Sequence, residues 1–286
     1  MMLDWLLAPF LEFAFMRRAL VAVLALALGA APLGVLLTLR RLSLVGDALS
    51  HAVLPGVALG FMFFGLSLTA MSVGGVMAGM LVVTVAALIS RHTRLGEDAS
   101  LAALYLVSLA LGVMLISWQG AQVDLLHILF GNVLGVDRHG LLLVACVSSA
   151  TVLILALAYR GLLLESFDPA YLAAGQGGAA WFQQLFLMLV VVNLVAAFQT
   201  LGTLMAVGLM MLPAVSARLW HDTLPAQLLH SVGQAVIAGV AGLLLSYYAA
   251  LPSGPAIIVS AGALYGGSLL LSPHGWLATW LRTAHT

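Results

Sequence analysis

An aspartate and a histidine stand four residues apart in the stretch RRLSLVGDALSHAVLPGVALG (40–60), within a chain that is otherwise almost entirely apolar. Residues four apart share one face of a helix, so Asp47 and His51 are neighbours if this stretch is helical. A carboxylate oxygen and an imidazole nitrogen are suitable ligands for Zn²⁺ or Mn²⁺. The pair therefore indicates a candidate site for a divalent metal ion.

Two simpler roles for the pair stay open. Asp47 and His51 could satisfy only each other, or Asp47 could cap the helix that follows the RRLS turn. Two ligands also do not complete a metal site, so the others must come from another helix or from a second copy of the chain. Pro55 lacks an N–H group for the carbonyl of His51 and should bend the helix there, as in transient ion sites along a transport pathway.

The composition of the chain defines the class of protein. Its 286 residues are 63% hydrophobic and 7% charged, whereas an ordinary soluble domain is roughly a quarter charged. A soluble fold could not bury so much apolar surface, and the mean hydropathy is +1.16. We therefore expect an all-α, polytopic helical membrane protein with a single transmembrane domain over residues 1–286. The net charge of zero leaves no basic field for nucleic acid.

A helix needs about 20 apolar residues to cross the hydrocarbon core. The stretch 203–220 is the weakest candidate, so eight or nine spans are expected. The candidates are 20–39, 44–64, 71–89, 100–118, 140–159, 181–200, 203–220, 229–250 and 255–272. In the second span, Asp47 and His51 lie about 9 Å and about 15 Å beyond Arg41, so His51 is near the middle of a core about 30 Å thick. Ionisable residues at that depth mark functional sites by default.

Arginine placement predicts the orientation of the chain in the membrane. If the loop 90–99 is cytoplasmic, seven of the ten arginines fall inside and three outside. The inside set is Arg40, Arg41, Arg91, Arg94, Arg160, Arg218 and Arg282, and the outside set is Arg17, Arg18 and Arg138. This arrangement places the N-terminus outside and, with nine spans, the C-terminus inside. Arg17 and Arg18 favour the reverse.

Two connections between the spans are long. The outer, extracytoplasmic one (119–139) contains an apolar piece, 125–136, that is too short to span and is typical of a re-entrant or interfacial segment. It also carries four weaker metal candidates, which could receive or gate an ion or could simply be polar residues at the membrane edge: Asp124, His127, Asp137 and His139.

The inner, cytoplasmic connection (160–184) includes ESFDPAYLAAG, which predicts a short helix. Asp168 can cap this helix, Pro169 suits its first position and Gly175 can end it. An ordinary loop helix is the alternative. Because the chain contains no lysine, a Walker A motif is impossible, and SHAVLP is not the H-E-x-x-H pattern of a zinc protease. The sequence therefore indicates no enzyme.

The stretch 40–60 resembles the signature of the metal-type ABC transporter permeases, which take up zinc, manganese or iron chelates. In that family an R-R-M-S-like turn leads into G-D-A-L-S-H-A-x-L-P-G. Three further stretches resemble the family in order and spacing: HILFGNVLGV (127–136), FDPAYLAAG (167–175) and FQTLGTLMAVGLMMLPAVSARLW (198–220). The likeness covers nearly the whole chain from about residue 14. Asn132 stands where the family often has Asp, which argues against a metal role for that position.

The resemblance implies a fold similar to that of the cobalamin-importer type of permease. It implies a homodimer in the inner membrane of a bacterium, with the pore between the two copies. It also implies two cytoplasmic ABC ATPase subunits, which would use the ATP, and an extracytoplasmic metal-binding protein. Asp47 and His51 match its positions for metal contact in the pore, and the match to its ATPase-coupling segment is carried by Asp168, Pro169, Tyr171 and Gly175.

The expected function is thus that of the membrane subunit of an ATP-driven importer for divalent metal ions, with no permanently bound cofactor. Asp and His serve both Zn²⁺ and Mn²⁺, and zinc is placed slightly ahead of manganese as the transported ion. An iron-chelate permease is the nearest alternative. An ion-coupled secondary carrier and a purely structural membrane scaffold are rivals from other classes.

Overall fold

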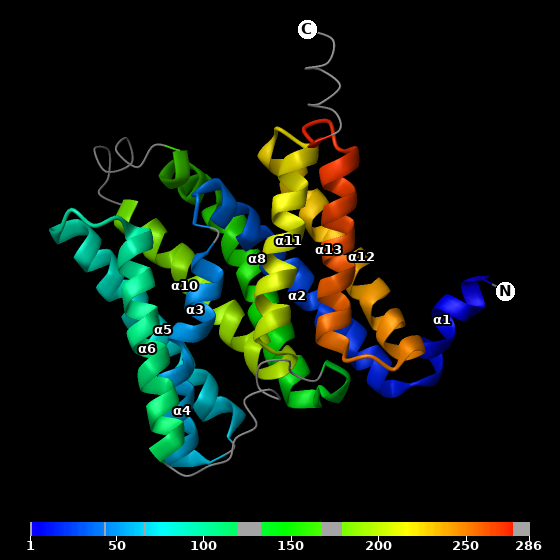
Figure 1. Ribbon diagram of the computed structural model, residues 1–286, viewed down its shortest axis with the longest axis horizontal. Coiled ribbons are helices and arrows are strands. Elements are labelled where there is room, and N and C mark those ends of the chain that lie inside the picture. Colours follow the sequence, from blue (N-terminus) through cyan, green and yellow to red (C-terminus); the bar gives the residue numbers. More distant parts are fainter. Residues whose placement is uncertain (1, 43, 66, 119–132, 168–178, 277–286) are drawn as a thin grey trace, which may run out of the picture.

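The structure is a computed structural model that describes residues 2–42, 44–65, 67–118, 133–167 and 179–276. Over these residues the chain is helical and forms no β-strand (Figure 1). The helices are α1 (Met2–Glu12), α2 (Ala14–Leu39), α3 (Val45–Ala52), α4 (Leu54–Phe64), α5 (Leu68–His92), α6 (Glu97–Trp118), the 3₁₀ turn η1 (Val133–Gly135), α8 (Arg138–Phe167), α10 (Ala179–Leu201), α11 (Thr203–Trp220), α12 (Leu224–Ala249) and α13 (Ser253–Leu271).

The described residues contain nine segments long and apolar enough to cross a membrane. Eight of them are single helices, and the ninth, Val45–Phe64, is made of α3 and α4 together. The all-α polytopic membrane fold is therefore confirmed. The weakest candidate, 203–220, forms the continuous helix α11 (Thr203–Trp220), although Pro213 lies inside it.

Several boundaries differ from those expected. α8 runs on to Phe167 and α10 starts at Ala179, so both ends of the connection expected over 160–184 are helical. α8 also starts at Arg138, inside the connection expected over 119–139. Polar residues at the ends of these helices hid their true lengths from a hydropathy criterion. Hydropathy also predicted no element before residue 20, where the structure has α1 and the first turns of α2.

α2 lies in the middle of the bundle and packs against α8, α11 and α12. Its buried face is rich in alanine and glycine, and small side chains allow neighbouring membrane helices to approach closely. Gly34 is the extreme case, because a Cβ atom added there would lie 1.9 Å from the carbonyl oxygen of Met210 on α11. The two backbones are therefore in direct contact.

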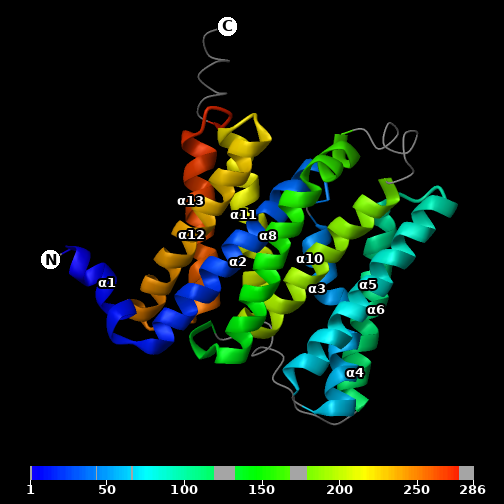
Figure 2. The same ribbon diagram turned by 180° about the vertical axis from the view of Figure 1, so that it is seen from behind.

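The remaining helices flank this centre on two sides. α4, α5 and α6 stand together on one side, and α11, α12 and α13 on the other, with α2, α8 and α10 between them (Figures 1 and 2). Large apolar side chains are exposed on the outside of the bundle, for example Leu106 and Met114 on α6 and Leu157 on α8. Such an outer surface suits contact with lipid.

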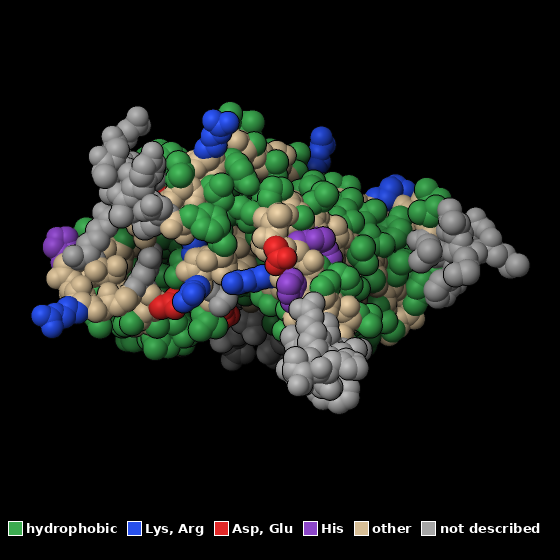
Figure 3. Space-filling model, turned by 90° about the horizontal axis from the view of Figure 1, so that it is seen from above, with side chains coloured by type: hydrophobic (Ala, Val, Ile, Leu, Met, Phe, Trp, Pro, Cys, Tyr) green, Lys and Arg blue, Asp and Glu red, His purple; other side chains and the backbone are tan. Residues whose placement is uncertain are grey.

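One end of the bundle gathers the end of α2, the start of α3, the end of α8 and the α11–α12 turn (Figure 1). Figure 3 looks onto this end and shows arginine, acidic and histidine side chains among hydrophobic ones. Arg17, Arg18 and Arg138 lie in the first turns of α2 and α8, which begin at the opposite end.

Candidate functional site

The RRLS turn ends α2 and places the start of α3. Arg41 adopts a left-handed conformation with a φ of 61°. The N–H of Leu42 donates to the carbonyl of Leu37 at 2.9 Å, and the N–H of Arg41 donates to that of Thr38 at 3.2 Å. This is the pattern of a Schellman ending, in which the left-handed residue is usually glycine. The N–H of Val45, the first residue of α3, then donates to the carbonyl of Leu42 at 3.1 Å.

Asp47 and His51 lie on one face of α3, as their spacing predicts. Nε2 of His51 is 3.8 Å from Oδ1 of Asp47, and the side chains are 27% and 63% exposed. That separation is longer than a hydrogen bond of about 2.7–3.2 Å. Asp47 also does not cap α3, because the N-cap position is Leu44 and has no side-chain hydrogen bond. Both side chains are accessible on the same face of α3. Their role as metal ligands stays a prediction.

The helix is interrupted directly after the pair. α3 ends at Ala52, Val53 forms a turn and α4 starts at Leu54, with Pro55 in its first turn. Ser108 on α6 donates its hydroxyl hydrogen to the carbonyl of Ala52 at 2.7 Å. The bend expected from Pro55 is thus a break, and a side chain from another helix satisfies a backbone group at it.

α3 packs against α6, α10 and α11. Gly46 faces α11, where an added Cβ would lie 2.8 Å from Cε of Met210. Within the part of the chain that the structure describes, no group of three or more His, Cys, Asp or Glu side chains could hold a metal ion. Among the described residues of a single copy, Asp47 and His51 therefore have no third side chain of these types close enough to complete a metal site.

The weaker metal candidates have different positions. Oδ1 of Asp137 accepts a hydrogen bond from the N–H of Gly140 at 2.7 Å, so Asp137 caps the N-terminus of α8. An Asp just before a long apolar helix could have predicted this role. His139 is exposed in the first turn of α8. Asp124 and His127 lie outside the described residues, as do the predicted coupling residues Asp168, Pro169, Tyr171 and Gly175.

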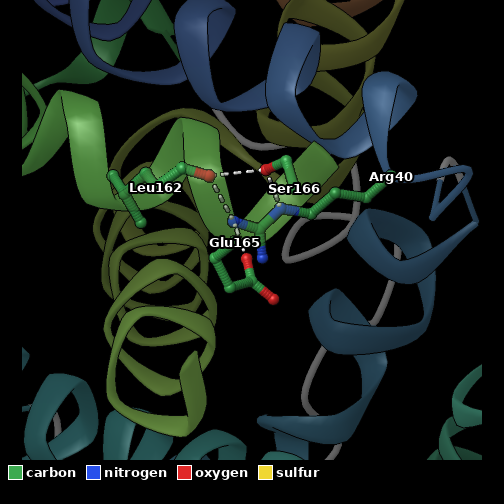
Figure 4. Close-up of polar contacts among 4 residues, drawn as sticks. All are labelled: Arg40, Leu162, Glu165 and Ser166. Atoms are coloured by element: carbon green, nitrogen blue, oxygen red, sulfur yellow. Dashed lines mark hydrogen bonds and ion pairs between the residues drawn. The ribbon is translucent and has the colours of Figure 1, made fainter. Parts of the chain in front are cut away.

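A polar cluster that no sequence pattern predicted lies where α2 and α8 end (Figure 4). The guanidinium of Arg40 forms an ion pair with Glu165 at 2.5 Å, and these side chains are only 8% and 12% exposed. Nε of Arg40 donates to the hydroxyl of Ser166 at 3.0 Å. The guanidinium also lies 4.0 Å above the ring of Phe186 on α10. Because Arg40 is more than a hundred residues from its partners in the sequence, no local sequence pattern predicts this cluster.

The fold and the pair on α3 together define a polytopic membrane protein with a candidate ion site on one of its membrane-crossing segments. The family model described as "ABC 3 transport family" matches residues 12–272. The chain therefore belongs to the ABC 3 transport family. The resemblance to the metal-type ABC permeases is confirmed by this match and by the relatives that follow.

The manganese transport system membrane protein MntC of Halalkalibacterium halodurans is 34% identical over 264 residues, which are 92% of this chain and 89% of the relative. A protein of Haemophilus influenzae named "Probable iron transport system membrane protein" is 28% identical over 264 residues, with coverages of 92% and 96%. The solved structure of PsaBC from Streptococcus pneumoniae in complex with Fab matches with a TM-score of 0.84 and 29% identity, over 99% of this chain and all of that one.

Proposed function

We propose that this chain is the membrane permease of an ATP-driven importer for divalent transition metal ions, and that manganese is its main cargo. The observation that carries the proposal is the placement of Asp47 and His51 on one face of α3, where both side chains are accessible and do not hydrogen-bond to each other. The sequence alone placed zinc slightly ahead. The same two ligand types serve Mn²⁺, and the name of the MntC relative favours manganese.

A second copy of the chain completes the site in this proposal. A carboxylate that is 63% exposed within a membrane-crossing segment is costly unless it faces water, a cation or another polar group. Two copies related by a two-fold axis would bring two aspartates and two histidines to one ion. Hard divalent ions such as Mn²⁺ favour this mixture of oxygen and nitrogen ligands over the sulfur ligands of a tight zinc site.

The partners follow from the family. Two ABC ATPase subunits would bind at the cytoplasmic segment that contains Asp168, Pro169, Tyr171 and Gly175, and would hydrolyse the ATP. An extracytoplasmic binding protein would deliver the ion to the opposite end of the bundle. The chain would lie in the inner membrane of a bacterium with its N-terminus outside and its C-terminus inside. Asp47 and His51 would hold the ion only briefly, since tight capture would prevent its release.

Uptake of radiolabelled Mn²⁺, Zn²⁺ and chelated iron into vesicles tests the proposal. The vesicles would contain the chain with its ATPase and binding protein, with and without ATP. His51→Ala and Asp47→Ala would be compared with wild type, and His92→Ala serves as the matched control because His92 is exposed at the end of α5.

We expect ATP-dependent uptake of Mn²⁺ that is lost in both site variants and retained in His92→Ala, with the complex still assembled. Preference for Zn²⁺ or for chelated iron would correct the cargo. Uptake that persists without ATP but stops when the ion gradient is dissipated would indicate a secondary carrier. Unchanged uptake in both site variants would rule out a metal role for the pair.

A further inference from the structure

The Arg40 cluster joins two parts of the chain that have separate tasks in the proposed function. We define the cluster as Arg40 from α2, Leu162, Glu165 and Ser166 from α8, and Phe186 from α10. Arg40 stands directly before the turn that leads into α3, which carries Asp47 and His51. Glu165 and Ser166 stand directly before residues 168–178, the proposed site for the ATPase (Figure 4).

Contacts from both sides of the segment 168–178 converge on Arg40. On the N-terminal side, its guanidinium reaches Glu165, the hydroxyl of Ser166 and the carbonyl of Leu162. On the C-terminal side, the guanidinium carbon lies over the ring of Phe186 from α10, 4.0 Å from the ring centroid. Arg40 is therefore in contact with both described helices that flank the segment, α8 and α10.

The connection from Arg40 to the metal pair is equally short. Arg40 is the C-cap of α2, and its own N–H donates to the carbonyl of Leu36 at 3.1 Å. The next turn is closed by the hydrogen bonds of Leu42 to Leu37 and of Val45 to Leu42. Because these backbone hydrogen bonds hold the turn between Arg40 and α3, a shift of Arg40 would be expected to change the orientation of the first turn of α3, which contains Asp47.

The chemistry of the cluster suits a discrete switch between arrangements. Separating a nearly buried ion pair is costly, because each charge is then left buried without its partner, so half-separated arrangements are disfavoured. The guanidinium also presents its donors in a rigid planar fork, which lysine cannot reproduce. A small cavity lies beside the pair, lined by Arg40, Leu42, Glu165, Ser166, Gln183 and Leu187. It leaves space for these side chains to rearrange.

We propose that Arg40 is a positioning residue that couples the movement of the segment 168–178 to the orientation of α3. In this role the Arg40 cluster makes each cycle of ATP hydrolysis change the access of the metal pair, and it does not itself touch the ion. The proposal rests on the proposed function, because it takes 168–178 as the segment that the ATPase moves.

The test measures the number of Mn²⁺ ions taken up per ATP hydrolysed in vesicles that contain the complete transporter. The variants are Arg40→Gln, Glu165→Gln, the double variant and the conservative Arg40→Lys. Arg160→Gln is the matched control, because it removes the same charge from an exposed position on α8. Mn²⁺ binding without ATP is measured alongside, since a role in coupling should leave it unchanged.

We expect the ratio of uptake to hydrolysis to fall by about 2-fold to about 30-fold in Arg40→Gln and Glu165→Gln. The ratio in Arg40→Lys should lie between those of these variants and wild type, and the ratio in Arg160→Gln should equal that of wild type. The double variant should be no worse than either single variant, because both remove the same interaction.

An unchanged ratio of uptake to hydrolysis in the cluster variants would overturn the proposal, even if both rates fall. If none of the cluster variants assembles with the ATPase, the cluster serves assembly alone and the proposal also fails. Wild-type vesicles distinguish a failure of the coupling role from a failure of the proposed function. Absence of ATP-dependent uptake in wild type contradicts the proposed function itself, whereas normal wild-type uptake with an unchanged ratio in Arg40→Gln contradicts only the coupling role.

Discussion

Ionisable side chains in this bundle lie in two different environments. Arg40 and Glu165 are almost buried and bonded to each other, whereas Asp47 and His51 are partly exposed and stand 3.8 Å apart. The spacing of Asp47 and His51 was enough to predict that they share a helix face, because helical periodicity is a local property. The Arg40–Glu165 pair joins distant parts of the sequence, so only the folded chain reveals it.

Asp137 tests whether a weaker metal candidate is merely a helix cap. Asp137→Ala should lower the stability of the protein by about 1 kcal/mol, because the N–H of Gly140 loses its partner. Mn²⁺ uptake per assembled transporter should be unchanged. Thermal unfolding in detergent and vesicle uptake measure the two quantities, with His92→Ala at the exposed end of α5 as the control. Lost uptake without lost stability would instead indicate a role in transport.

At the scale of elements, the break at Val53 separates the site-bearing helix α3 from α4. Pro55→Ala supplies an N–H for the carbonyl of His51 and should favour a continuous helix. We expect Mn²⁺ affinity to weaken by about 1 kcal/mol, roughly fivefold, because the pair is displaced. Equilibrium binding of Mn²⁺ measures this change.

Pro225→Ala is the matched control, since Pro225 also lies in the first turn of its helix, α12, and is exposed there. Equal affinities in wild type and Pro55→Ala would mean that the break does not position the pair.

The contact between α4 and α5 depends on two glycines. A Cβ on Gly56 would lie 2.0 Å from the carbonyl oxygen of Gly74, and a Cβ on Gly74 would lie 2.2 Å from that of Gly56. Gly74→Ala should therefore destabilise the protein by about 1–3 kcal/mol through overpacking. Gly233→Ala on α12 meets open space and should be neutral or stabilising. Thermal unfolding measures the stability of both variants. A Gly74→Ala protein as stable as Gly233→Ala would contradict the close contact.

The elements that hydropathy predicts well are those whose whole length faces lipid or the apolar core, such as α13, expected over 255–272 and found at Ser253–Leu271. Helix ends were predicted less well, because they carry polar groups that fold back onto the protein. α8 extends to Phe167 since Glu165 and Ser166 bond to Arg40, an interaction that a window of apolar residues cannot anticipate. α1 contains Asp4 and Pro9 and is too short to span, so it produced no signal.

At the scale of the whole molecule, the number of spans fixes which loops share a side of the membrane. With nine spans and the proposed orientation, the α11–α12 turn faces the cytoplasm and the start of α5 faces outward. Composition predicted the class of protein correctly, whereas the orientation that arginine placement predicts stays a prediction. The proposed metal site takes ligands from a second copy, and contacts between copies are not encoded in the spacing of residues along one chain.

Cysteine labelling tests this orientation. In a Cys146→Ala background, Thr69→Cys at the start of α5 and Thr223→Cys at the α11–α12 turn are both exposed positions. A membrane-impermeant maleimide added to intact cells should label Thr69→Cys and spare Thr223→Cys until the membrane is opened. The reverse pattern would place the N-terminus inside.

The shortness of α3 bears on how such transporters diversify. Its eight residues hold both candidate ligands, and Asp47 contributes little to the packed core because most of its side chain is exposed. Exchanging this residue should therefore cost little folding stability, and the rest of the bundle need not adapt. If Asp47 binds the ion as proposed, cargo preference can change during evolution through exchanges at a few positions of α3, while the fold stays intact.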